Sequence, residues 1–249
     1  MKAFANLVLI KIKLYLREPI IIFFSFLFGP LVMILSSNID KSGVMDEIGQ
    51  MSAVSNMFPA YLCINLIMSG IMTMPVTIAG SRERGEIRRF RITPLPTAVY
   101  VFADIFVYFL AAIVGLLFMI VAAQSILHVQ FGLKIAALFG GYTVCLFTFF
   151  SLGYIIASLA PNARIAQVFG TIFGIPMMLF TIIQARAPQT SLPIDKISWG
   201  IPLVHAERFL RSVWLSQVDG TTYIHLTVLI VLFVVGLIVS ALSFRWGAE

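Results

Sequence analysis

The residue types that carry most enzyme chemistry are few in this sequence and stand far apart. His128, His205 and His225 do not have the spacing of an H-E-x-x-H metal site, and neither a G-x-S-x-G nucleophile nor a paired aspartate motif occurs. Cys63 and Cys145 stand singly in apolar runs, so they form neither a C-x-x-C pair nor an evident disulfide. The sequence therefore predicts that this chain is not an enzyme and binds no metal or cofactor itself.

Uncharged polar residues recur inside two apolar stretches at a spacing of four, which places each set on one side of a helix. One interpretation is a weakly polar pathway lining, which would suit an amphipathic or lipid-like cargo because no charge accompanies it. The other is helix packing through interhelical hydrogen bonds. The residues concerned are Asn65, Ser69, Thr73, Thr77, Gln167 and Thr171.

The densest charge lies between Ser81 and Arg91, where seven of eleven residues are charged in a chain of which only 11% is. Glu83 and Glu86 alternate with the bases, and a Pro-Leu-Pro sequence at 94–96 ends the segment. A basic loop can simply anchor a membrane protein on its inner side. The interleaved carboxylates instead favour a short helix that docks on another protein.

Asp104 is the only carboxylate inside a predicted membrane span. An acid in the membrane is a functional hypothesis by default. It lies near the end of its span, however, where we expect it to reach water or to pair with Arg17, Arg88 or Arg91. A structural role and a functional role both remain open for it.

The elements that position these residues follow from composition. Of the 249 residues 60% are hydrophobic, and the mean hydropathy of +1.00 exceeds what a soluble chain of this length can bury. Consecutive apolar residues, as at 20–24, exclude the alternation of a membrane barrel. We predict an all-α membrane protein: residues 1–249 form a single transmembrane domain with six transmembrane helices of about 20 residues or more. The predicted spans are 19–39, 57–80, 98–126, 134–160, 164–185 and 222–244.

Two segments outside the spans are predicted to lie on the membrane surface. Residues 1–18 form an N-terminal interfacial amphipathic helix or, alternatively, a basic flank that only sets topology. In the helical interpretation Phe4, Leu7, Leu14 and Tyr15 face lipid. Short interfacial or re-entrant helices are expected between spans five and six, where Glu207 and Arg211 have the i,i+4 spacing of a supporting ion pair.

The distribution of bases predicts the orientation. With the N-terminus inside, eleven Lys and Arg lie on the cytoplasmic side against six outside, so both termini are placed in the cytoplasm. The expected location is the plasma membrane, in a bacterium the cytoplasmic membrane. We therefore interpret the net charge of +6 as a cytoplasmic surface that docks on another protein and not as a surface that binds nucleic acid. The eleven are Lys2, Lys11, Lys13, Arg17, Arg82, Arg84, Arg88, Arg89, Arg91, Arg164 and Arg245.

The segment from Arg82 to Pro96, RERGEIRRFRITPLP, resembles the loop signature of the ATP-binding-cassette (ABC) type 2 exporter permease family. Weaker likenesses follow in the family's order: an Arg-Glu-Pro at 17–19 that enters the first span, Pro161 before the fifth, and Pro-Leu to Leu-Arg over 202–211. After span five the family often has a Ser-Gly pair, where this chain has Phe-Thr-Ile at 180–182, so the outer gate is expected to pack differently.

The resemblance implies the permease subunit of an ATP-driven exporter. Such a subunit pairs with a second permease, identical or related, and with cytosolic ABC ATPase subunits that hold ATP and Mg²⁺; membrane lipids are the other partners and nucleic acid is not one. The chain itself has no G-x-x-x-x-G-K-[ST] phosphate loop. A short coupling helix between spans two and three would contact the ATPase. The residues carried over to it are Arg82, Glu83, Arg84, Gly85, Glu86, Arg88, Arg89 and Arg91.

Other classes remain as alternatives. A secondary transporter or channel is disfavoured because inverted repeats and midplane charges are missing, and an intramembrane enzyme because the chain lacks catalytic motifs. The family resemblance leaves the cargo open among drugs, peptides and lipids, so multidrug or peptide efflux is one expectation among several. It also leaves open whether the permease pairs as a homodimer or a heterodimer.

Overall fold

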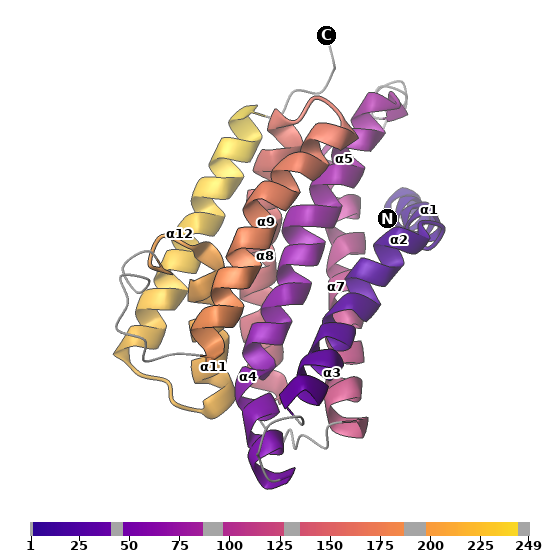
Figure 1. The fold of residues 1–249 in the computed structure, drawn as a ribbon. Helices are drawn as coiled ribbons and strands as arrows, with labels where there is room; N and C mark the ends of the chain where they lie inside the picture. The colour runs from indigo at the N-terminus through magenta and orange to yellow at the C-terminus, as the bar shows by residue number, and fades with distance from the viewer. Residues whose placement is uncertain (1, 41–46, 87–96, 127–134, 187–197, 244–249) are drawn as a thin grey trace.

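The structure, a computed structural model, describes residues 2–40, 47–86, 97–126, 135–186 and 198–243, and in these ranges every regular element is helical. The helices form an elongated bundle, and one short helix, α1, is seen end-on beside it (Figure 1). The expected all-α class is confirmed. The elements are α1 (Lys2–Tyr15), α2 (Pro19–Ile22), η1 (Phe23–Leu27), α3 (Phe28–Asp40), α4 (Glu47–Ile67), η2 (Met68–Thr73), α5 (Met74–Glu83), α7 (Thr97–Ser125), α8 (Ile135–Leu159), α9 (Ala163–Arg186), α11 (Pro202–Leu215) and α12 (Gly220–Ser243).

Within the described residues, six helical stretches are long and apolar enough to cross a membrane, as the sequence predicts. The first joins α2, η1 and α3, and the second joins α4, η2 and α5 without a break. The remaining four are single helices. The six stretches are Pro19–Ser36, Ser55–Glu83, Val101–Ser125, Ile135–Leu159, Ala163–Ala185 and Gly220–Ser243.

Prolines fix where the helices begin and where their hydrogen-bond pattern changes. Pro19 takes the first position of α2, where no N–H is needed, and the preceding Glu18 is extended at φ −100° and ψ 91°. Pro75 near the start of α5 follows the π-helical turn η2. A proline cannot donate to the carbonyl one turn earlier, and the wider π turn accommodates that loss without ending the helix.

The π turn η2 is packed tightly between α8 and α9. A Cβ on Gly153 of α8 would overlap the Gly70 carbonyl oxygen, and a Cβ on Gly70 would lie 2.8 Å from Phe149 Cβ. On the other side, a Cβ on Gly170 of α9 would lie 2.8 Å from the Ile71 carbonyl oxygen. Glycines thus let three backbones approach more closely than any side chain permits, as small residues do in membrane bundles.

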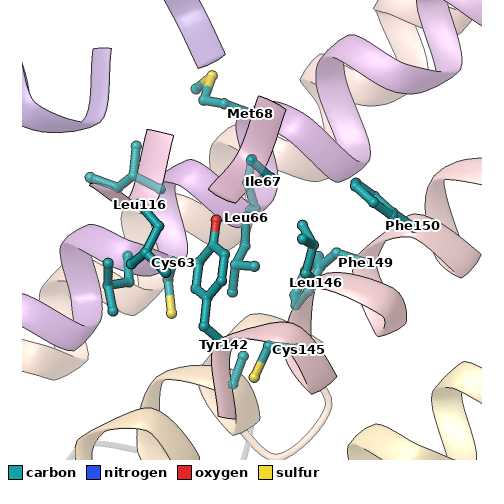
Figure 2. Packing of buried hydrophobic residues seen from close by; sticks show 14 of the residues in the cluster. Cys63, Leu66, Ile67, Met68, Leu116, Tyr142, Cys145, Leu146, Phe149 and Phe150 are labelled. Carbon is teal, nitrogen blue, oxygen red and sulfur yellow. The ribbon is translucent and has the colours of Figure 1, made fainter. Parts of the chain in front are cut away.

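The core of the bundle lies around Tyr142 of α8. Its ring is fully buried and stands among side chains of α4, η2, α7 and α8, including Leu66, Leu116 and Phe149 (Figure 2). Cys63 and Cys145 belong to the same cluster; both are free thiols, fully buried.

Helix α11 is the amphiphilic element expected between spans five and six, and it packs in the lower half of the bundle against α4, α8, α9 and α12 (Figure 1). Trp214 donates its indole N–H to the Ser55 carbonyl at 2.8 Å and lies on Phe58, with 5.2 Å between ring centroids. The expected i,i+4 ion pair is confirmed, since Arg211 lies 2.6 Å from the Glu207 carboxylate. Residues 187–197, also expected to hold short helices, lie outside the described residues.

The fold brings together two histidines that are 20 residues apart. His205 Nδ1 of α11 lies 2.9 Å from His225 Nδ1 of α12, and His205 Nε2 lies 3.0 Å from the Trp199 carbonyl. Arg208 stands over the Trp199 ring at 5.8 Å. Among the residues that the structure describes, no group of three or more His, Cys, Asp or Glu could hold a metal ion. The two histidines, His205 and His225, are therefore part of the packing contact between α11 and α12.

Candidate coupling site

Helix α1 lies at the side of the bundle, in the half where α5 ends, and packs on α7 (Figure 1). Leu7 and Tyr15 are buried against the protein, so the expectation that they face lipid is wrong. The Tyr15 ring meets Tyr108 of α7 edge-on, with 5.7 Å between centroids. Leu9, Ile10 and Leu14 are the exposed apolar residues of this helix. The face that periodicity assigns to lipid is in part the face that docks on α7.

Lys11 is the base that fixes α1 to α7. Its ammonium group donates to the Asp104 carboxylate, and the two side chains are only 11% and 16% exposed. The sequence predicts that this acid reaches water or pairs with Arg17, Arg88 or Arg91. Among the described residues its ion-pair partner is Lys11 and not Arg17, because docking of α1 turns Lys11 away from lipid; Arg88 and Arg91 lie outside the described residues. Burial lowers the pKa of the Lys11 ammonium, while the carboxylate opposes that shift.

A chain of buried hydrogen bonds runs from α1 into the core. The Tyr15 hydroxyl donates to Ser25 Oγ of η1 at 2.6 Å, and Asn65 Nδ2 of α4 donates to the Ser25 carbonyl at 2.9 Å. The Tyr142 hydroxyl of α8 donates to Asn65 Oδ1. Four helices therefore share one polar network, and a displaced α1 would strain bonds that reach the middle of the bundle.

The end of α5 is tied to the turn between α8 and α9. The guanidinium of Arg82 is buried and donates to the Ala160 carbonyl, one of the last acceptors of α8. Glu83 accepts from the Ala163 N–H at 3.1 Å, so its carboxylate lies at the N-terminus of α9, where the helix dipole favours negative charge. Asn162 caps the same helix end through the Ile165 N–H at 2.9 Å.

Beyond α5 the chain turns sharply at Gly85, whose φ of +70° lies in the left-handed region that favours glycine. Arg84 and Glu86 flank this turn and pair with each other at 2.6 Å. The remaining carried-over residues, Arg88, Arg89 and Arg91, and the short coupling helix expected there lie outside the described residues.

The polar stripe of the second span points mostly into the protein. Asn65, Ser69 and Thr73 are buried, and Ser69 donates to the Asn65 carbonyl at 2.7 Å. Thr77 is half-buried and donates to the Thr73 carbonyl at 3.1 Å. The bonds of Ser69 and Thr77 lie within their own helix, whereas Asn65 bonds to Ser25 and Tyr142 of other helices. A pathway role for the stripe stays a prediction.

On α9, Gln167 is exposed and Thr171 is half-buried. Both lie on the helix that carries Gly170 and Gly174 against η2, and their pathway role also stays a prediction. The Phe-Thr-Ile sequence at 180–182 lies within α9, where the buried Thr181 donates to the Met177 carbonyl at 2.8 Å.

A family model described as ABC-2 family transporter protein matches residues 35–244, which is most of the chain. The chain belongs to the ABC-2 transporter family. No curated protein and no solved structure matches it. Membership makes the chain a multi-pass membrane component of a transporter, not a catalytic subunit by itself, and it implies association with an ABC ATPase.

For a permease of this family, the tertiary structure adds residues that sequence reasoning missed. In the sequence Lys11 is only one of eleven predicted cytoplasmic bases, and Tyr15 is only a predicted lipid-facing ring. Ser25 and Tyr142 carry no sequence signal, because single hydroxyls are common in apolar helices. Their roles depend on contacts between helices far apart in the chain.

Proposed function

We propose that this chain is the membrane subunit of an ATP-driven ABC exporter. It pairs with a second permease and two cytosolic ATPase subunits and moves an amphipathic or lipid-like substrate, such as a drug, peptide or lipid, out of the cytoplasm. The end of the bundle that carries α1, the end of α5 and the α8–α9 turn faces the cytoplasm in this proposal, since the bases are concentrated on that side.

The observation that carries the proposal is the connection of the charged segment after span two to two other helices, α8 and α9. Arg82 and Glu83 join the end of α5 to the α8–α9 turn, so a force applied to this segment would act on α8 and α9 directly. The chain from Tyr15 to Tyr142 joins α1 to the core in the same way. A force that an ATPase applies to this end would thus be transmitted to the bundle through two sets of contacts, those of Arg82 and Glu83 and the hydrogen bonds from Tyr15 to Tyr142.

An amphipathic cargo is supported by where the charges lie. Lys11 and Asp104 pair near one end of the bundle, while Glu207 and Arg211 pair on α11 in its other half. The polar groups deeper in the second span, such as Asn65 and Ser69, are uncharged and bonded to neighbours. Transport of a bare ion would need midplane charges or rings of oxygen ligands.

The test is purification from native membranes followed by reconstitution. The tagged chain should bring down a subunit that carries a G-x-x-x-x-G-K-[ST] loop, and the complex should hydrolyse ATP while the permease alone does not. Robust ATPase activity in a partner-free preparation would contradict the proposal.

Two variants of Glu83 separate docking from folding. Glu83→Gln keeps an oxygen that accepts the Ala163 N–H but removes the charge, so it should fold normally and lose substrate-stimulated ATPase activity at least fivefold. Glu83→Lys should lose the α9 cap as well. Gln217→Lys, at an exposed position beyond α11, adds one positive charge far from this segment and should leave activity unchanged. Equal activity in Glu83→Gln and the wild type would refute the docking role of this carboxylate.

A further inference from the structure

The first half of the first span is fixed to the bundle at few points. Among the described residues of α2 and η1, Ser25 alone is buried. On the outer side Ile20, Phe23 and Leu27 are 69%, 39% and 46% exposed, so they face lipid. The contacts of Ser25 therefore largely decide how this stretch is held.

The backbone of Ser25 is bonded to the second span. Its carbonyl accepts from Asn65 Nδ2 of α4 at 2.9 Å. Gly115 of α7 packs directly on that bond, because a Cβ there would lie 2.5 Å from both the amide nitrogen and the carbonyl oxygen. Beside it, Phe26 stacks on Phe118 of α7 with 6.2 Å between ring centroids. The turn η1 is thus fixed to α4 and α7.

The hydroxyl of Ser25 holds a different element, α1. It accepts from the Tyr15 hydroxyl at 2.6 Å, and both residues are buried. Between these two residues regular α-helix is interrupted twice. Glu18 is extended at the junction of α1 and α2, and in η1 the Phe28 N–H donates five residues back, to the Phe23 carbonyl. Helices bend at π turns of this kind.

The part of the first span beyond η1 has contacts of its own. The Ser36 and Tyr61 hydroxyls lie 2.5 Å apart and join α3 to α4, and Met33 of α3 is fully buried. Helix α1 is joined to α7 by the Lys11–Asp104 pair, which also has to separate when α1 moves away. The segments before and after η1 are therefore fastened independently.

We infer that α1 and α2 form an arm that pivots at η1 and is held closed by the hydrogen bond of Tyr15 with Ser25, the Tyr15–Ser25 latch. With the latch closed, a movement of α1 reaches Asn65 and Tyr142 through the buried hydrogen bonds. With the latch open, the arm moves while η1 and α3 stay in place. The latch thus regulates whether a movement of α1 enters the core. That an ATPase supplies this movement rests on the proposed function, whereas the arm and its latch belong to this chain alone.

The experiment measures thiol labelling of the purified chain in lipid nanodiscs, without any partner. One reporter lies on each side of η1: Leu7→Cys in α1, where the native residue is 4% exposed, and Met33→Cys in α3, where it is 0% exposed. A buried thiol reacts while its segment is open, so the labelling rate follows the open fraction. Cys63 and Cys145 are fully buried, and the chain without a reporter gives their background.

Two variants open the latch without enlarging any side chain. Tyr15→Phe removes the donor and Ser25→Ala removes the acceptor, and each should raise the labelling rate of Leu7→Cys about three- to tenfold, the usual effect of losing one buried hydrogen bond. The rate of Met33→Cys should stay the same. Ser36→Ala is the matched control, because it removes another bond between a serine and a tyrosine, in α3; it should speed Met33→Cys and not Leu7→Cys.

A double variant tests whether the two hydroxyls act on one bond. Tyr15→Phe with Ser25→Ala should label no faster than the faster single variant; effects that multiply would refute the latch. An unchanged Leu7→Cys rate in both single variants would refute it as well. Equal acceleration of both reporters would show that the first span moves as one body and that η1 is no pivot. If Ser25→Ala fails to fold, Tyr15→Phe still decides, since it removes one hydroxyl and keeps the ring. Because no ATPase is present, each of these failures leaves the proposed function standing.

Discussion

Substituting Gly153 by alanine tests the close approach between α8 and the π turn η2. A Cβ at this position would overlap the carbonyl oxygen of Gly70 and lie 3.1 Å from its carbonyl carbon and 3.0 Å from Met74 Cε. The Met74 methyl can move, but the Gly70 backbone cannot without shifting η2, which Gly170 of α9 blocks on its far side. The two helices must therefore separate.

Overpacking of this kind costs about 1–3 kcal/mol, and we expect the upper end because backbone atoms block the way. For a chain of this size each 1 kcal/mol shifts the melting temperature by about 2–4 °C, so Gly153→Ala should melt roughly 6–12 °C below wild type. The assay is a thermal ramp in detergent with a thiol-reactive dye. Cys63 and Cys145 are fully buried, so they react only when the bundle opens.

The same helix supplies its own controls. A Cβ at Gly140 would meet nothing within 4 Å, so Gly140→Ala should be neutral or stabilise by up to about 1 kcal/mol through helix propensity. A Cβ at Gly141 would lie 3.2 Å from the Phe209 ring edge, which can give way, and this variant should fall between the other two. If Gly153→Ala melts no lower than Gly140→Ala, the described contact between η2 and α8 is wrong.

Three further outcomes are expected. Tyr142→Phe removes the donor to Asn65 Oδ1 deep in the core and should destabilise the chain by about 1–3 kcal/mol, measured in the same thermal ramp; an unchanged melting temperature would contradict the hydrogen bond. Lys11→Met alone leaves the Asp104 carboxylate poorly compensated and should cost about 3 kcal/mol, whereas Lys11→Met with Asp104→Leu should recover most of it; additive losses would show that the two groups do not interact. Hydrogen bonds at the start of α12 lower the pKa of Asp219 to about 2, below its unfolded value of about 3.9, so its stabilising effect is present above pH 4 and is lost as the pH falls toward 2. Wild type should thus melt above Asp219→Asn at pH 6 and together with it near pH 2; a gap that persists at pH 2 would mean that the charge is not responsible.

Much of the fold follows from one-dimensional patterns. Six apolar runs of spanning length predict six helices, because a helix in hydrocarbon must satisfy its own backbone hydrogen bonds over about 20 residues. The ion pair of Glu207 with Arg211 follows from helical spacing alone. Such features depend on neighbours within one helix, and their geometry is the same wherever the helix lies.

The contacts of the candidate coupling site were only partly predictable. The family resemblance predicts that Arg82 and Glu83 are coupling residues, yet it does not show that the buried Arg82 guanidinium donates to the Ala160 carbonyl. The polar stripe of Asn65 and Ser69 is visible in the sequence, but the hydrogen-bond partners that other helices supply to Asn65 are not. The spanning helices of a membrane bundle are largely apolar on all sides, so periodicity separates their protein-facing from their lipid-facing sides poorly.

The sequence alone determined the class, the number of spanning helices and the family likeness of one loop, and it predicted the side of the membrane on which positive charge gathers. Only the tertiary structure decided that α1 turns Lys11 toward Asp104, that His205 meets His225, and that glycines let η2 sit between α8 and α9. The physical reason is the range of the interactions. Hydropathy and helical spacing act within a segment, whereas a buried polar group takes its partner from whichever helix the packed bundle places beside it.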